Sequence, residues 1–166
     1  MGLPPTAAEL RGSGIQFTFE YLGSVPVTAA LHEMTDDMRP LVVKECINII
    51  AGACGIIPVR ETNAIIKLVV GTPEVAKHMV DLNISTKALT IIYADKKNND
   101  KMNRMIARHN IELVSFAAQG SEESKTANMF GYIAKRRDDR RCHVFRFDDV
   151  PRVMHIIDGR HSISNS

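Results

Sequence analysis

The chain has 166 residues, with 45% apolar and 24% charged side chains and a formal net charge of +2. These proportions are typical of one soluble globular domain and exclude a disordered or collagen-like chain. The near balance of charge excludes a domain whose whole surface binds nucleic acid, although a local basic patch is compatible with it.

The three cysteines, Cys46, Cys54 and Cys142, are odd in number and have no regular spacing. This pattern does not fit a disulfide framework and favours reduced thiols. The first residues have no charged segment followed by an apolar one, so they do not resemble a secretory signal. We therefore expect a cytoplasmic location. The longest uncharged stretch, residues 46–59, is too short for a membrane-spanning helix.

The N-terminal part predicts a leader, a strand and a helix, in that order. Residues 1–14 are rich in Pro, Gly and Ala and indicate a flexible leader. Apolar and polar residues alternate over 15–27, which predicts a strand with one buried face, and Gly23 and Pro26 indicate a bulge or an edge position near its end. Residues 35–40 have the composition of a helix start, and Gly52 and Gly55 are expected to end that helix.

The rest of the chain predicts short strands at 64–70, 79–85, 89–93, 111–118, 128–135 and 142–147. Residues 136–141 form a charged turn between the last two strands, residues 150–158 have the spacing of a short helix, and residues 159–166 form a polar tail. Strands in series with short turns imply an α+β fold with an antiparallel sheet bent into a sandwich or open barrel. The final helix would cap it.

Three segments, taken together and in order, resemble a phosphotyrosine-binding (PTB) domain of the Shc adaptor type. They are residues 19–27, which contain Tyr-Leu-Gly, residues 111–118, and residues 130–135 followed by 141–145. The resemblance covers about residues 15–157 and implies a domain over 15–158. It also implies a pleckstrin-homology-like barrel of about seven antiparallel strands, with an inserted helix and a short C-terminal capping helix.

The resemblance implies a signalling adaptor domain that binds tyrosine-phosphorylated receptor tails of the Asn-Pro-x-Tyr type. In such domains the peptide joins a sheet edge as an additional antiparallel strand. The accepting edge would be residues 111–118. The residues expected to form the peptide groove are Ile111, Leu113, Val114, Phe116, Ala117 and Met154.

The same resemblance implies a phosphotyrosine pocket made of Arg39, Ser115, Lys135 and Arg141. Arginine suits a phosphate because its planar guanidinium donates two parallel hydrogen bonds. One departure concerns the C-terminal helix, which is interrupted at Gly159 and lacks the Phe-rich second half of Shc-type helices. A domain that no longer binds peptide is therefore a further hypothesis.

The main alternative is a phosphorylation-independent module that binds peptide, phosphoinositide head groups or both. Basic clusters at 96–97 and 136–141 would meet the lipid, which implies recruitment to the inner face of the plasma membrane. Catalysis is not expected, because His109, His143 and His155 are scattered and no Gly-rich phosphate loop is present. No cofactor, metal site or nucleic-acid partner is predicted.

Overall fold

The computed structural model describes residues 12, 14–28, 34–94 and 105–147. In this part of the chain seven antiparallel strands form one sheet in the order β4-β3-β2-β1-β7-β6-β5. The strands are β1 (Ile15–Pro26), β2 (Glu74–Ile84), β3 (Ala88–Tyr93), β4 (Met105–Asn110), β5 (Val114–Gln119), β6 (Met129–Arg136) and β7 (Asp139–Arg146). The helices are α2 (Met38–Ala53), α3 (Ala64–Lys67) and the 3-10 turn η2 (Ile111–Leu113).

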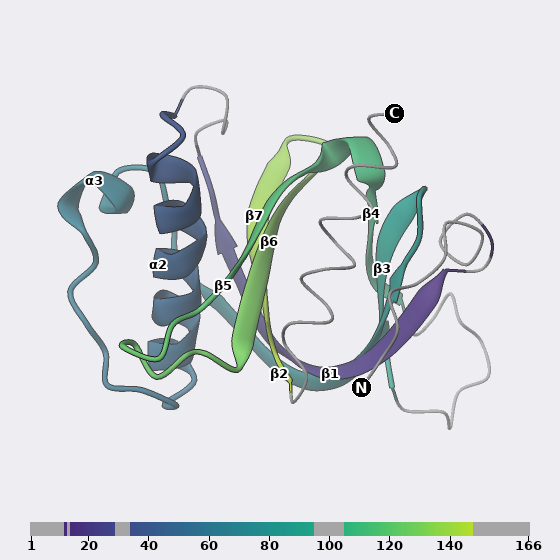
Figure 1. Cartoon of the computed structure of the whole chain (residues 1–166), viewed down its shortest axis with the longest axis horizontal. Helices are drawn as coiled ribbons and strands as arrows, with labels where there is room; N and C mark the ends of the chain where they lie inside the picture. Colours follow the sequence, from purple (N-terminus) through teal and green to yellow (C-terminus); the bar gives the residue numbers. More distant parts are fainter. Residues whose placement is uncertain (1–11, 13, 29–33, 95–104, 148–166) are drawn as a thin grey trace.

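The long strand β1 is the spine of the sheet. It pairs with β2 from Ile15 onward and with β7 up to Pro26, and both registers shift between Tyr21 and Gly23. This shift is a β-bulge, as the sequence predicts, and bulges bend the strand that carries them. The sheet consequently curls, with β5, β6 and β7 on one side and β3 and β4 on the other (Figure 1).

Two apolar cores lie on the two faces of this curled sheet. The first fills the hollow and takes side chains from both arms, for example Leu89 of β3 and Phe130 of β6. The second lies between the outer face of the sheet and α2. Successive residues of a strand point to opposite faces, so β6 contributes Tyr132 to the first core and Ile133 to the second.

Helix α2 covers the outer face of β5, β6, β7 and β1. Its apolar residues recur at the spacing of one helix face, and those that face the sheet are buried: Val42, Val43, Cys46, Ile47, Ile50 and Ala51. The helix predicted after residue 35 is confirmed. Asp37 occupies its N-cap without a side-chain cap hydrogen bond, and its first turn has no acidic residue.

The structure corrects two predicted strands. Residues 64–70 were predicted as a strand, but they contain α3, whose start is capped by Asn63 Oδ1 accepting from the Ile65 amide at 2.9 Å. Ile65 and Leu68 are exposed there. A short apolar run fits either a strand or a helix, and the N-cap hydrogen bonds of Asn63 favour the helix here. The strand predicted over 111–118 begins at Val114, after η2, and β4 was not predicted.

Several predictions concern residues outside the described ranges. They are the leader apart from Gly12 and Gly14, the basic pair at 96–97, the helix at 150–158 with Met154, and the tail at 159–166. In the described part of the chain no helix is long and apolar enough to cross a membrane.

Candidate functional site

Strand β5 lies at one edge of the sheet. Its only strand partner among the described residues is β6, so its other edge has backbone N–H and C=O groups without a ladder partner. Such an edge can accept one more strand. At the start of β5 the register shifts between Val114 and Phe116, and this bulge contains Ser115, whose side chain is exposed. A bulge re-aims the side chain that it carries.

The hairpin of β6 and β7 closes more tightly than the sequence indicates. Residues 136–141 were predicted as one charged turn, but Arg136 pairs with Asp139, so only two residues connect the strands. Arg137, in the left-handed region at φ 56°, is one of them. The strands therefore extend through positions predicted as loop, and pleating sends neighbouring side chains there to opposite faces.

The register brings two cations together on the α2 face. Lys135 of β6 pairs directly with Arg140 of β7, and partners in an antiparallel pair share a face. The next pair toward the sheet interior, Ile133 and Cys142, packs under α2. Lys135 and Arg140 are half-buried, and neither side chain has a hydrogen-bond or ion-pair partner among the described residues. Two like charges at directly opposed strand positions repel, so an anion between them would be stabilising.

Arg141 lies on the other face, because it pairs with Ala134 of the inner core. Its Nε donates to Asp139 Oδ2 at 2.9 Å, and its Nη1 donates to Ser24 Oγ at 3.1 Å and lies 3.5 Å from Glu74 Oε2. The guanidinium is thus engaged by two carboxylates and a hydroxyl. This arginine ties β7 to β1 and β2, and it does not face Lys135.

Arg39 lies in the first turn of α2 and pairs with Asp36, Nη1 to Oδ1 at 3.4 Å. Asp36 is almost fully exposed, so this pair is weak. The positive end of the helix dipole lies at the same turn, where the carboxylates of Asp36 and Asp37 partly offset it. Figure 1 shows the first turn of α2, the start of β5 and the β6–β7 turn at the same end of the sheet. Arg39, Ser115, Lys135 and Arg140 therefore belong to one end of the α2–β5–β6–β7 layer.

The residues predicted for the peptide groove divide by burial. Leu113, in η2, is 39% exposed, and Phe116 is half-buried against the outer core. Val114 is only 4% exposed and packs in the inner core together with Ala117. Val114 can therefore contribute its backbone to an added strand, whereas its side chain stabilises the barrel. Ile111 is half-buried at the start of η2.

A polar cluster lies inside the barrel, below these groups. Tyr21 Oη is 2.9 Å from His143 Nδ1, and His109 Nδ1 is 3.0 Å from Tyr132 Oη. The two imidazole rings lie 4.5 Å apart between their centroids. His109 belongs to the edge strand β4 and Tyr132 to β6, so this hydrogen bond links the two arms of the curled sheet. Buried polar groups need such partners, and here they supply one another.

Burial keeps both histidines neutral. Desolvation, helped by the charge of Arg136 and opposed by Asp139, lowers the pKa of His109 to about 4. Desolvation also lowers the pKa of His143 well below its usual value, with smaller effects of His109 and Arg141 in the same direction. The unfolded chain therefore binds more protons than the folded chain between about pH 6.5 and pH 4.

We expect the free energy of unfolding to fall as the pH is lowered through this range. His109 alone should remove about 3 kcal/mol by pH 4, because one pKa unit corresponds to about 1.4 kcal/mol. Urea titrations at several pH values measure the slope. His109→Gln should flatten it, while the control His78→Gln, at an exposed position of β2, should not. An unfolding free energy that is constant between pH 7 and pH 4 would contradict this prediction.

Within the described ranges, no three His, Cys, Asp or Glu side chains converge in a way that could hold a metal ion. Cys46, Cys54 and Cys142 are free and buried. Burial raises the pKa of the Cys54 and Cys142 thiols, so they remain protonated.

A curled seven-stranded antiparallel sheet with α2 against its outer face is the architecture of the pleckstrin-homology-like class. In the described part of the chain, the β5 edge lacks a further strand partner, and Arg39, Lys135 and Arg140 form a cationic corner at one end of the layer. The chain belongs to the family "Phosphotyrosine interaction domain (PTB/PID)", whose profile matches residues 17–161. The chain is 41% identical over 156 residues to the SHC-transforming protein homolog 1 of Caenorhabditis elegans, covering 93% of the chain and 47% of that protein.

Human relatives are more distant. The chain is 26% identical over 156 residues to human SHC-transforming protein 3, covering 89% of the chain and 25% of that protein. It is 28% identical over 143 residues to human SHC-transforming protein 4, covering 81% of the chain and 21% of that protein. The chain thus spans about half or less of these relatives. The family match confirms the phosphotyrosine-binding-domain resemblance predicted from the sequence.

The sequence analysis assigned Arg141 to the pocket and did not assign Arg140 to it. Both faces of β7 are buried beyond Arg141, so alternation alone does not say which arginine faces α2. The signal that decides is the length of the hairpin turn, which fixes the pairing of Lys135.

Proposed function

We propose that this domain binds phosphotyrosine within Asn-Pro-x-Tyr-type protein tails as part of a signalling adaptor. The phosphate would be held by Arg39, Ser115, Lys135 and Arg140. Arg141, predicted for the pocket from the sequence, would instead support it by fixing β7 to β1 and β2. The observation that carries the proposal is the pair of half-buried cations, Lys135 and Arg140, side by side on the α2 face without an anionic partner among the described residues.

Phosphate fits this corner chemically. A phosphotyrosine carries about −1.5 to −2 charges and three acceptor oxygens. The guanidinium of Arg140 and the ammonium of Lys135 supply charged donors, and the exposed hydroxyl of Ser115 supplies a neutral one.

The peptide backbone would pair with the free edge of β5 as an antiparallel strand. Backbone hydrogen bonds along this edge would give affinity that is independent of sequence, and the bulge at Ser115 would place the pocket at one end of the added strand. A turn at Asn-Pro in the peptide would then direct the phosphotyrosine from the strand into the cationic corner.

A titration with a fluorescent Asn-Pro-x-phosphotyrosine peptide and its unphosphorylated twin tests this function. We expect micromolar or somewhat tighter binding of the phosphopeptide, because each charged hydrogen bond contributes about 1.5–3 kcal/mol and peptide ordering offsets much of it. The twin should bind at least tenfold more weakly. Equal affinity for both peptides would place the domain among phosphorylation-independent modules, and no binding by the folded protein would refute the proposal.

The phosphoinositide alternative has less support. Arg136 and Arg137 are exposed at the β6–β7 turn, but Asp138 and Asp139 are adjacent and reduce the positive potential there. Vesicles of phosphatidylcholine with and without phosphatidylinositol bisphosphate, added to the same peptide titration, distinguish the two functions. The proposal predicts that the vesicles do not displace the phosphopeptide.

A further inference from the structure

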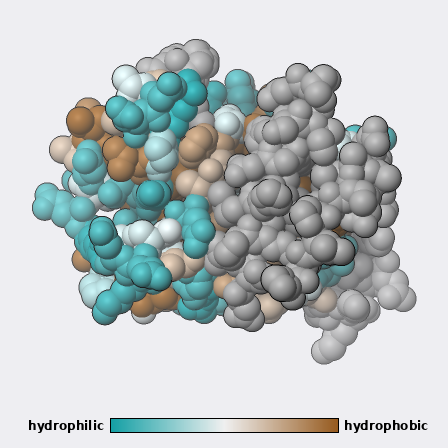
Figure 2. Space-filling model, viewed as in Figure 1, coloured by the Kyte–Doolittle hydropathy of each residue, from teal (hydrophilic) through white to brown (hydrophobic). Residues whose placement is uncertain are grey.

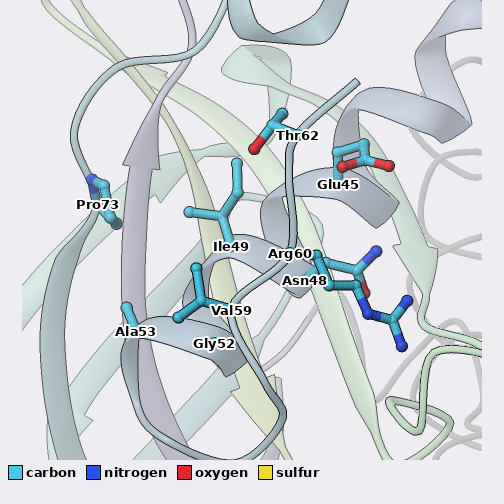
Figure 3. Close-up of a pocket in the computed structure, with 9 residues that line it drawn as sticks. All are labelled: Glu45, Asn48, Ile49, Gly52, Ala53, Val59, Arg60, Thr62 and Pro73. Carbon is cyan, nitrogen blue, oxygen red and sulfur yellow. The ribbon is translucent and has the colours of Figure 1, made fainter. Parts of the chain in front are cut away.

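A pocket of about 200 Å³ lies on the side of α2 that faces away from the sheet. The stripe of α2 that carries Glu45, Asn48, Ile49 and Gly52 forms one wall, and the segment from Val59 to Thr62 together with Pro73 forms the other (Figure 3). These helix positions are three or four residues apart, so they share one face. The buried stripe of α2 faces the opposite way, toward the sheet.

One half of this α2 pocket is apolar. Ile49 lies at its centre, with Val59, Ala53 and Pro73 around it (Figure 3). Val59 is 83% exposed although it is aliphatic, and Leu41, one turn before Glu45 on α2, is 46% exposed. Figure 2 shows apolar surface over the part of the molecule where α2 and α3 lie. Clustered apolar surface of this kind marks a place where another group binds.

The other half is polar. Glu45 and Asn48 are half-buried, and Thr62 is half-buried on the facing segment. None of the three side chains has a hydrogen-bond or ion-pair partner among the described residues. A carboxylate, an amide oxygen and a hydroxyl all accept hydrogen bonds. This half of the pocket therefore suits a positively charged group with several hydrogen-bond donors.

Arg60 does not neutralise Glu45. It is exposed, its Nη1 donates to Ser124 Oγ at 3.3 Å, and in Figure 3 its guanidinium extends away from Ile49. Ser124 belongs to the segment between β5 and β6, so Arg60 serves to hold the 59–62 segment in place. The carboxylate of Glu45 therefore has no cationic partner within the described part of the chain.

We propose that the α2 pocket binds an arginine side chain of a partner protein. Its methylene stem would cover Ile49 and Val59, and its guanidinium would donate to Glu45, Asn48 and Thr62. The volume fits one long side chain and is below the roughly 300–1,000 Å³ of pockets for larger ligands. Guanidinium is more weakly hydrated than ammonium and is planar, so a half-buried carboxylate with further acceptors favours arginine over lysine.

This contact is separate from phosphopeptide binding. The α2 pocket opens on the outer stripe of α2, whereas the cationic corner lies at the sheet side of its first turn. The domain could therefore hold a phosphotyrosine tail and an arginine-bearing segment at the same time, on two sides of one helix.

The test is a titration of the whole ¹⁵N-labelled chain, followed by NMR, with the peptide acetyl-Ala-Arg-Ala-amide. Its twin contains citrulline, which has the same shape without the charge. We expect saturable shifts of the Asn48, Ile49, Gly52 and Val59 amides with a millimolar dissociation constant. The citrulline twin should bind at least fivefold more weakly than the arginine peptide. A lysine peptide should bind about twofold more weakly.

Variants of the chain isolate the carboxylate. Glu45→Gln should weaken the arginine peptide at least fivefold, and the matched control Glu61→Gln, an exposed glutamate that does not line the pocket, should leave its affinity unchanged. Neither change should alter phosphopeptide affinity, so this inference can fail while the proposed function stands. Equal binding of the citrulline twin, unchanged affinity of the Glu45→Gln variant, or shifts confined to other amides would overturn it. So would tighter binding of acetyl-Ala-Glu-Ala-amide to these residues.

Discussion

Replacing Arg140 by alanine should weaken binding of the phosphorylated Asn-Pro-x-Tyr peptide roughly ten- to hundredfold. The side chain lies opposite Lys135 on the α2 face and has no partner among the described residues. Its removal would take one charged hydrogen-bond donor from the phosphate and would break no described contact of the fold. Affinity for the unphosphorylated twin should be unchanged. Isothermal titration calorimetry with both peptides gives the ratio of the two affinities for each variant.

Arg141→Ala is the matched comparison, because it removes the same side chain one residue along the strand. It breaks contacts to Ser24, Asp139 and Glu74, so it should lower the free energy of unfolding by about 1–2 kcal/mol. The preference for the phosphopeptide over its twin should survive. Arg140→Lys should fall between alanine and the native residue, because ammonium lacks the planar fork. If Arg141→Ala abolishes that preference and Arg140→Ala does not, the assignment of the pocket is wrong.

Gly23→Ala should lower the free energy of unfolding by more than about 4 kcal/mol, a large part of the 5–15 kcal/mol typical of a domain. Gly23 lies at the bulge of β1 with φ 144°, which side chains rarely adopt. A Cβ there would overlap the carbonyl oxygen of Glu74 on the paired strand β2. The alanine would therefore force β1 and β2 apart at the centre of the sheet. Guanidinium titration monitored by circular dichroism measures the loss.

Gly55→Ala distinguishes the free-energy cost of a positive φ from the cost of a steric overlap. Gly55 also has a positive φ, 76°, but a Cβ there would meet nothing within 4 Å. Its replacement should cost only about 1–2 kcal/mol, the penalty of the left-handed conformation. Similar losses for the two variants would show that the close approach of β1 and β2 at Gly23 is not what requires glycine.

The bend of β1 at Gly23 was predictable from the sequence. The alternation over residues 15–27 with Gly23 near its end predicts a strand that bends, and β1 does so between its pairings with β2 and β7. Helix α2 was equally predictable, because its start signature, apolar stripe and terminal glycines agree. Residues 64–70 were mispredicted because their apolar run has no period that favours a strand over a helix, and Asn63 fixed the outcome locally.

The sequence by itself determined the class of protein, the alternation of β1, the position of α2 and the presence of serine, lysine and arginine side chains near one hairpin. Those features are local, or they are ordered motifs that can be read along the chain. Only the tertiary structure decided that Arg140 and not Arg141 faces Lys135, because the two-residue turn sets the register of β6 and β7. A shift of the register by one residue would place each side chain of the strand on the opposite face of the sheet. The α2 pocket likewise exists only because the chain after α2 folds back over its outer stripe, which no local pattern specifies.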